Sequence, residues 1–411
     1  VLLLLVVVVV VMVVLLRRQL LLLQPLPLPQ HTSIDVCSMV CLTRVVCCMD
    51  CMAYCPRVFV ADGFCIIQQI VADLRVISML ISLASTKINM SEKITLKTNV
   101  ELGVVPTHIK FVGGLVPDDS GRLPRGDDGQ LLVVSEMKHL TEISPVKIGS
   151  AQFTIFPGVD EIDTDDMITG LRGLDLAVHL MLMVGGADPM NPEDEDKVVE
   201  MLKAGLEVAK KYNIQQVAST SIEEWMQEGA TPKTGDDFEA AVAQNAKVHA
   251  RAVQESGAID SGIKNWHIEF LRGGEFQTFT DVAKCWEVVK ATNQQLGSKF
   301  FRVMVDAAHC GDSDLSIPEN QSKITEIAYS DEFSMFHASA KTTRGCLSTD
   351  DGWISALLSA AAKSGKLEFV FVELFHHEDP ALEALRNLDS GHGIDTTDGR
   401  SYSQAVADGL G

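Results

Sequence analysis

Basic residues are scarce in this chain. It has 34 lysines and arginines against 55 aspartates and glutamates, which gives a formal net charge of −21 over 411 residues. No stretch of the sequence gathers lysines and arginines into a cluster. Because an acidic surface repels phosphate groups, we expect no nucleic-acid partner unless the fold builds a local basic groove. A small substrate, neutral or bound with the help of a cation, fits this charge better.

The first part of the chain lacks the residues that punctuate ordinary folds. Residues 1–89 contain no glutamate and a single glycine, Gly63, whereas they hold seven of the ten cysteines. Glycines and acidic capping residues mark the turns and helix starts of soluble domains, so their scarcity argues against such a domain here. We expect residues 1–89 to be a non-conforming extension, and Met90 to be the natural start of the working protein.

A hydrophobic run of membrane-spanning length is also missing. Residues 1–16 are wholly apolar, but a spanning helix needs about 20 such residues. Arg17 and Arg18 follow this run, whereas a secretory signal carries its basic residues before the apolar run. We therefore expect no membrane association unless residues 1–16 are a genuine, poorly formed signal anchor.

The cysteines do not form a recognisable framework. Cys48 and Cys51 make a CxxC pair, yet no second pair stands at the spacing of a zinc site. After Met90 only three cysteines occur, widely separated: Cys285, Cys310 and Cys346. This usage is typical of a reducing compartment, so we expect a cytoplasmic location.

The remainder of the chain alternates short apolar stretches with amphipathic helices, which is the pattern of a parallel α/β fold. Eight is the number of strands that closes a barrel. The eight expected strands are residues 97–103, 146–151, 174–180, 214–219, 265–269, 301–306, 333–337 and 368–373. We predict a (β/α)8 barrel over residues 90–380 and a tail over 381–411, with a long loop at 113–129.

Helix signals support this division. Residues 131–143 predict one helix, and Asn191 followed by Pro192 offers a cap and a first helical residue. Apolar residues then recur at helical spacing, at Val198, Leu202, Leu206 and Ala209. Similar stripes begin at Phe238 and Val282. We interpret these stripes as core.

Four of the expected strands end in a residue that can bind a hard metal ion. These residues are Glu269, Asp306, His337 and Glu373, which are separated by 37, 31 and 36 positions. Each interval is close to one strand-loop-helix unit of roughly 30 or more residues. A single acidic residue at a strand end is more often a helix cap or a solvated loop residue. Four on successive strands predict convergence at the C-terminal face of a barrel.

The composition of this set indicates a metal site. Three carboxylates and an imidazole are an oxygen-rich group suited to Mn²⁺ first, with Mg²⁺, Co²⁺ or Zn²⁺ as alternatives. Without a cation, three clustered carboxylates would repel one another and raise each other's pKa. We therefore predict a divalent metal bound by these four side chains.

Two further residues extend the predicted site. His309 follows Asp306 by three positions, at the start of the loop leaving that strand, where it is placed to bind a substrate hydroxyl or a second metal. Glu275 follows Glu269 by six positions, and Gly273 and Gly274 between them allow the loop to fold back over the site. A single histidine in a loop usually has a structural role. Here the neighbouring predicted metal ligand Asp306 favours a functional role for His309.

This set of residues resembles the xylose isomerase-like TIM barrels, and among them the ketose 3-epimerases of the tagatose and psicose type. The resemblance implies metal-binding Glu, Asp, His and Glu at the ends of strands five to eight, which match the four residues above. It also implies substrate contacts by Glu275 and His309. The stretch from Asp351 to Phe375 looks like the final helix and strand of that family. The resemblance covers about residues 97–380 and is specific only from about Trp266 onward.

Some positions match the family less well. The family has an arginine shortly after the histidine ligand, and Arg344 is a shifted candidate for this substrate-binding role. The polar run at 376–378, His-His-Glu, suits a solvated loop better than a second metal cluster. His179 is interpreted as a histidine that lines the barrel or lies in the core.

The resemblance implies proton transfer next to a carbonyl through a metal-stabilised enediolate, as in a sugar or sugar phosphate isomerase or epimerase. Glu269 and Glu373 are the candidate catalytic pair. An inosose-type dehydratase on the same barrel would use the same ligands, so it stays an alternative. An apurinic endonuclease needs an Asp-x-His after its last ligand, which Asp350-Asp351-Gly352 does not supply. A non-catalytic sugar-binding barrel and a homo-oligomer also stay open.

Overall fold

The computed structural model describes residues 93, 98–156, 158–340, 352–374 and 400–411. The extension predicted at residues 1–89, with its apolar run and its CxxC pair, lies outside the described residues and stays a prediction. Within the described part of the chain, no helix has both the length and the apolar character needed to cross a membrane.

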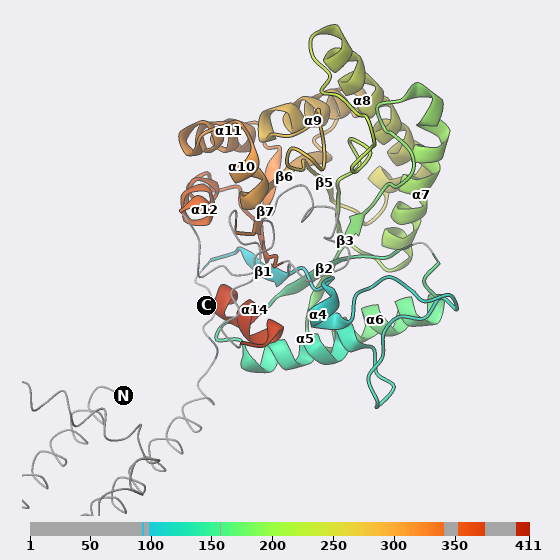
Figure 1. Cartoon of the computed structure of the whole chain (residues 1–411), viewed down its shortest axis with the longest axis vertical. Coiled ribbons are helices and arrows are strands. Elements are labelled where there is room, and N and C mark those ends of the chain that lie inside the picture. The colour runs from blue at the N-terminus through green and yellow to red at the C-terminus, as the bar shows by residue number, and fades with distance from the viewer. Residues whose placement is uncertain (1–92, 94–97, 157, 341–351, 375–399) are drawn as a thin grey trace, which may run out of the picture. The chain divides into compact units, whose positions relative to one another are not determined.

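Eight parallel strands close into a barrel in simple sequential order, with β8 paired to β1 (Figure 1). This confirms the predicted fold class and the predicted number of strands. The strands are β1 (Glu101–Val104), β2 (Ser150–Thr154), β3 (Ala177–Leu182), β4 (Gln216–Ser219), β5 (Asn265–Glu269), β6 (Phe301–Asp306), β7 (Phe333–Ala338) and β8 (Phe369–Val372).

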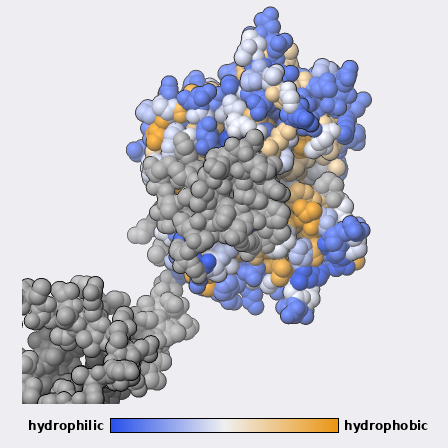
Figure 2. All heavy atoms as spheres, viewed as in Figure 1, coloured by the Kyte–Doolittle hydropathy of each residue, from blue (hydrophilic) through white to orange (hydrophobic). Residues whose placement is uncertain are grey.

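Helices lie around the outside of the barrel and connect successive strands (Figure 1). Hydrophilic side chains cover much of their outer surface (Figure 2). The described helices are α4 (Ile109–Val112), α5 (Leu132–Ile143), α6 (Glu161–Gly173), α7 (Glu195–Lys211), α8 (Asp236–Ser256), α9 (Val282–Leu296), α10 (Ala307–Asp312), α11 (Ile317–Tyr329), α12 (Trp353–Lys363) and α14 (Tyr402–Leu410), with 3₁₀ turns η3 (Pro192–Asp194) and η4 (Ala258–Asp260).

The first four strands begin two to four residues later than the sequence pattern predicts. Before β2, Val146 and Ile148 are apolar and buried, so they resemble strand residues although pairing with β3 begins only at Ser150. Before β3, Asp175 has a φ of 62° and makes the turn that ends α6. Apolar residues just before a strand therefore show the same sequence pattern as the strand itself. Strands β5 and β6 have the predicted bounds.

The predicted helices are present with small changes. Asn191 does cap a helical segment, because its side chain accepts a hydrogen bond from the backbone N–H of Glu193 at 3.1 Å. That segment is the 3₁₀ turn η3, and the α-helix α7 begins only at Glu195. The expected apolar stripe of α7 is buried, which confirms its interpretation as core.

The long loop predicted at 113–129 is held to the barrel through Asp163 of α6. This buried carboxylate accepts hydrogen bonds from the backbone N–H of Leu123 at 2.7 Å and from Arg122 Nε at 3.0 Å. Arg125 pairs with the same carboxylate. These cations and the N–H donor lower the pKa of Asp163 in spite of its burial. Arg125 also pairs with Asp166, so the loop has two charged contacts on the helix that follows β2.

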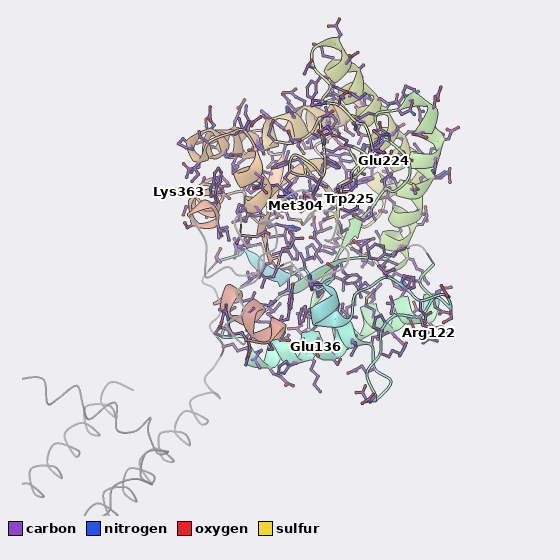
Figure 3. All side chains as sticks on the ribbon, in the orientation of Figure 1. Arg122, Glu136, Glu224, Trp225, Met304 and Lys363 are labelled. Atoms are coloured by element: carbon purple, nitrogen blue, oxygen red, sulfur yellow. The ribbon has the colours of Figure 1, made fainter. Side chains whose placement is uncertain are left out.

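The interior of the barrel is packed with side chains from alternate strand positions. Ala218, Met304, Met335 and Phe371 form one buried cluster there, and Figure 3 shows Met304 near the centre of the molecule. In a strand, residues two apart point to the same side of the sheet. The residues two positions after Met304, Met335 and Phe371 therefore also face the barrel axis, at its C-terminal mouth.

Candidate metal centre

The four predicted ligands meet at the C-terminal mouth of the barrel. Glu269, Asp306, His337 and Glu373 are all buried, and one possible ligand atom from each lies within 4.8 Å of the others. The first two are the last residues of β5 and β6, His337 is the penultimate residue of β7, and Glu373 directly follows β8. Four neighbouring strands thus contribute one side chain each to a single point.

The pleat of the strands explains this convergence. Asp306, His337 and Glu373 each lie two residues after an interior side chain of the cluster described above. Cross-strand pairing sets their position along the barrel axis, since Asp306 is in register with His337. The backbone N–H of Glu373 donates to the carbonyl of Ala338 at 3.2 Å, which extends the strand alignment to the last ligand.

The imidazole of His337 lies between two carboxylates on one side and the amide of Gln152 on the other. Its Nδ1 is 3.1 Å from Glu373 Oε2 and 3.8 Å from Glu269 Oε1. On the opposite side of the ring, Nε2 is 2.6 Å from Gln152 Oε1. The edge of the ring also contacts Phe371, with ring centres 5.8 Å apart. His337 is therefore held on all sides, with one nitrogen directed at the acidic cluster.

His309 joins this cluster, but it does not lie in a loop as the sequence predicted. It is in the short helix α10, which begins immediately after β6 because the Asp306 side chain accepts from the backbone N–H of His309 at 2.7 Å and caps the helix. The ring Nδ1 of His309 lies 3.4 Å from Glu269 Oε1. Capping by Asp306 thus places this imidazole against a second member of the predicted ligand set.

Glu275 lies in the buried loop between β5 and α9. Its Oε1 accepts a hydrogen bond from the indole of Trp225 at 3.2 Å, and its Oε2 is 3.4 Å from Arg272 Nε. Arg272 also approaches Asp312 at the end of α10, with 3.6 Å between Nη1 and Oδ2. The carboxylate is therefore tied both to the loop after β4, which carries Trp225 (Figure 3), and to the helix that carries His309.

A buried glutamate that sequence reasoning missed supports this loop. The two carboxylate oxygens of Glu223 accept hydrogen bonds from the backbone N–H groups of Gln277, Thr278 and Phe279, at 2.8 to 3.2 Å. The glutamate stands in the loop after β4, and its three donors begin two residues after Glu275 along the chain. Nothing in the local sequence of Glu223 distinguishes it from the neighbouring acidic residues.

Gln152 was also missed, although a signal for it exists. The predicted second strand ended at residue 151, three positions too early and just short of Gln152, whereas β2 extends to Thr154. Ser150, Gln152 and Thr154 alternate through this strand, and all three are buried. Buried polar residues at alternate positions of a barrel strand point to polar partners inside the barrel.

Other predicted residues have separate outcomes. His179 lines the barrel as expected: its Nε2 is 2.8 Å from Glu101 Oε1, and its ring packs edge-on against Phe369 and Phe371. Arg344, the acidic pair at 350–351 and the polar run at 376–378 lie outside the described residues, so their roles stay predictions.

The remaining buried titratable groups favour structural roles. Burial raises the pKa of the Cys285 and Cys310 thiols, so both stay protonated and are poor nucleophiles. Burial lowers the pKa of His267 to about 3 and that of His249 to about 4, so both imidazoles are neutral at physiological pH.

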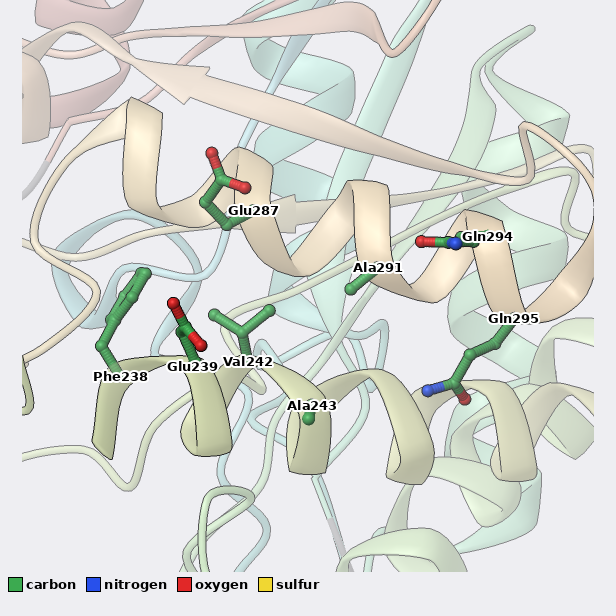
Figure 4. A pocket seen from close by; sticks show the side chains of 8 residues that line it. All are labelled: Phe238, Glu239, Val242, Ala243, Glu287, Ala291, Gln294 and Gln295. Carbon is green, nitrogen blue, oxygen red and sulfur yellow. The ribbon is translucent and has the colours of Figure 1, made fainter. Parts of the chain in front are cut away.

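One surface hollow of about 500 Å³ lies between α8 and α9 (Figure 4). Phe238, Val242 and Ala291 supply its apolar lining, and Glu239, Glu287, Gln294 and Gln295 surround them. None of the predicted site residues lines it. It is therefore separate from the candidate metal centre at the barrel mouth.

Comparison with known proteins gives relatives by structure only. No protein-family profile matches the chain, and no curated protein matches its sequence. Among solved structures, it is similar to the D-allulose 3-epimerase of Methylomonas sp., with a TM-score of 0.57, 13% identity, and coverage of 77% of this chain and 98% of that enzyme.

Two further enzymes are similar to a comparable degree. An L-ribulose 3-epimerase gives a TM-score of 0.56 at 16% identity, covering 75% of this chain and 92% of that enzyme. A D-psicose 3-epimerase gives 0.56 at 10% identity, covering 76% and 97%. At these identities the likeness concerns the fold alone, and that fold is the closed eight-stranded parallel barrel that the sequence predicted.

Proposed function

We propose that this protein is a metal-dependent sugar or sugar phosphate epimerase or isomerase. The observation that carries the proposal is the convergence of three carboxylates and one imidazole on four successive strand ends. The barrels of similar fold are named as 3-epimerases of D-allulose, L-ribulose and D-psicose. Site chemistry and fold thus favour the same class of reaction, although fold alone would not decide it.

The donor set suits a divalent cation. Glu269, Asp306 and Glu373 bring three acidic groups into one buried cluster, and the Nδ1 of His337 is directed at two of them. Buried carboxylates in such proximity are stable as anions only when positive charge compensates them. Hard oxygen ligands with one imidazole favour Mn²⁺, with Mg²⁺, Co²⁺ or Zn²⁺ as alternatives. A cation held there would supply the positive charge that stabilises an enediolate.

The proposed proton transfer uses the first and last ligands. Glu269 stands at the end of β5 and Glu373 after β8, so the two carboxylates occupy the two ends of the four-strand arc that forms the site. A substrate between them would have one carboxylate on each face of its reacting carbon. One carboxylate removes the proton next to the carbonyl, and the other returns a proton from the opposite side, which inverts the centre.

The surrounding residues would bind and orient the sugar. His309 contacts Glu269 and Glu275 is hydrogen-bonded to Trp225, so both polar groups are held in place before substrate arrives. Such preorganisation reduces the cost of aligning a hydroxylated substrate. Arg344, from the resemblance alone, is a further proposed substrate ligand.

The proposal is tested by assaying the full chain, loaded with Mn²⁺, against a panel of ketoses, ketose phosphates and inososes in D₂O. We expect one substrate class to yield an epimer or isomer that carries solvent deuterium at the reacting carbon. Loss of water from an inosose would assign the dehydratase alternative instead. Failure across the panel together with no bound metal would contradict the proposal and favour a non-catalytic barrel.

A further inference from the structure

Gln152 reaches the candidate metal centre from the opposite side of the barrel. It lies on β2, which pairs with β1 and β3, whereas His337 lies on β7. Their contact therefore crosses the barrel interior, where Gln152 is 1% exposed. The 2.6 Å between Gln152 Oε1 and His337 Nε2 is a short hydrogen bond between two fully buried polar groups.

A second contact decides which way the amide of Gln152 faces. Its Nε2 lies 3.3 Å from the thioether sulfur of Met335. A thioether accepts hydrogen bonds and cannot donate them, so the amide N–H group belongs on the side of the sulfur. The amide carbonyl is then directed at His337, and because a carbonyl only accepts, the imidazole must donate from Nε2.

In a neutral imidazole, as a metal ligand must be, this donation determines the state of the other ring nitrogen. A neutral imidazole has one N–H, and when Nε2 carries the hydrogen, Nδ1 presents a lone pair. That lone pair is directed at the carboxylates of Glu373 and Glu269, at 3.1 and 3.8 Å. A lone pair facing carboxylate oxygens is unfavourable by itself, whereas a cation between them turns all three groups into ligands.

We propose that Gln152 is a positioning residue that holds His337 in the Nε2–H tautomer and so makes Nδ1 a metal ligand. The inference rests on the proposed function, because it presumes that the four-residue cluster binds a divalent cation. Ligating histidines commonly donate their second N–H to an acceptor that fixes ring and tautomer, and loss of that acceptor weakens metal binding about 10- to 100-fold.

The test measures Mn²⁺ binding to the metal-stripped full chain by titration calorimetry. Gln152→Met keeps the length and burial of the side chain but removes the acceptor, and we expect Kd to rise about 10- to 100-fold. Gln152→Glu retains an oxygen acceptor for the N–H, and we expect its Kd to stay near that of the unmodified chain. Gln216→Met, at a buried glutamine of β4, is the matched control and should leave Kd unchanged.

Several outcomes would overturn the inference. Equal Mn²⁺ affinity in Gln152→Met and the unmodified chain would show that the acceptor is dispensable. An equal loss in Gln152→Met and Gln152→Glu would assign the effect to packing. If the unmodified chain binds no divalent ion, the metal centre and this inference fail together. If it binds Mn²⁺ and turns over no sugar, only the proposed reaction fails, and the affinity series still decides the role of Gln152.

Discussion

The position and the hydrogen bonding of each residue in the candidate centre depend on its immediate contacts. Asp306 caps α10 through one side-chain oxygen while it belongs to the acidic cluster, so one carboxylate links the metal site to the position of His309. Glu373 is held by the backbone of β7 and contacts His337. Burial alone keeps other imidazoles neutral, as at His249. At this scale, the chemistry of a side chain follows from what it touches.

The first prediction concerns Glu373→Gln. The substitution keeps size and burial but removes the proposed acid or base, so we expect turnover to fall at least about 100-fold while the fold persists. Steady-state kinetics with circular dichroism measures both. Glu368→Gln, at the half-exposed residue before β8, is the control and should keep its activity. Near-normal turnover in Glu373→Gln would refute the catalytic assignment.

The second prediction concerns His249 and pH. Its pKa falls from 6.5 in the unfolded chain to about 4 in the fold, so the unfolded state takes up a proton that the folded state does not. Its contribution to stability is complete above pH 6.5 and is lost as the pH falls toward 4. Between pH 7 and pH 5 the loss from this residue is about 2 kcal/mol.

Urea unfolding at both pH values measures this loss. In His249→Gln the difference in unfolding free energy between pH 7 and pH 5 should shrink by that amount. His139→Gln, at an exposed position, should keep the full pH dependence. An unchanged pH dependence in His249→Gln would mean that the buried imidazole is protonated in the fold.

At the scale of elements, the loops after the strands are tied to one another rather than to the barrel alone. The loop after β4 supplies Glu223 to three backbone N–H groups of the loop after β5, and Trp225 to Glu275. The loop before α5 is tied to α6 through Asp163. The mouth of the barrel is thus built from pairs of loops that share buried hydrogen bonds.

The third prediction concerns Glu223→Gln. An amide nitrogen would replace one of the oxygens that accept from residues 277–279, leaving a buried N–H donor opposed to another donor. We expect the loop carrying Glu275 to loosen, the melting temperature to fall, and KM for the sugar to rise more than kcat falls. Glu228→Gln, exposed in the same loop, is the control. A changed kcat with an unchanged KM would argue against this positioning role.

At the scale of the whole molecule, the barrel is closed around a packed interior that places acidic groups at one end. The net charge of −21 adds a long-range preference for cations to the local one. Binding of an ion to the folded state alone stabilises that state. The candidate metal centre draws one side chain from the end of each of β5 to β8, so an ion bound there should affect the stability of the barrel as a unit.

The fourth prediction is that Mn²⁺ stabilises the full chain. At a free concentration about 100 times its Kd, a ligand of the folded state adds about 2.7 kcal/mol of stability, which shifts the melting temperature by several degrees. Scanning calorimetry of metal-stripped protein, with and without Mn²⁺, measures the shift, and EDTA should reverse it. The same melting temperature in both samples would contradict the metal centre.

Much of this architecture could be predicted from the sequence, because it is encoded locally. Glu269, Asp306 and His337 follow apolar strand residues, and their spacing repeats with the β/α unit. Strand starts such as that of β2 were misplaced, because Val146 is apolar and buried although the continuous strand begins only at Ser150. The helical position of His309 was also missed, because a carboxylate that caps a helix and one that binds a metal look alike in sequence.

The sequence by itself determined that eight strands alternate with helices and that four of them end in potential metal ligands, because strand pleat and repeat spacing are local properties. Only the tertiary structure decided which groups surround those ligands. Gln152 and His337 are 185 positions apart, and they meet because closure of the barrel lets side chains of β2 and β7 face each other across its interior. Likewise Glu223 finds its donors 54 or more positions away. Such contacts depend on closure and side-chain direction, which no local pattern of residues contains.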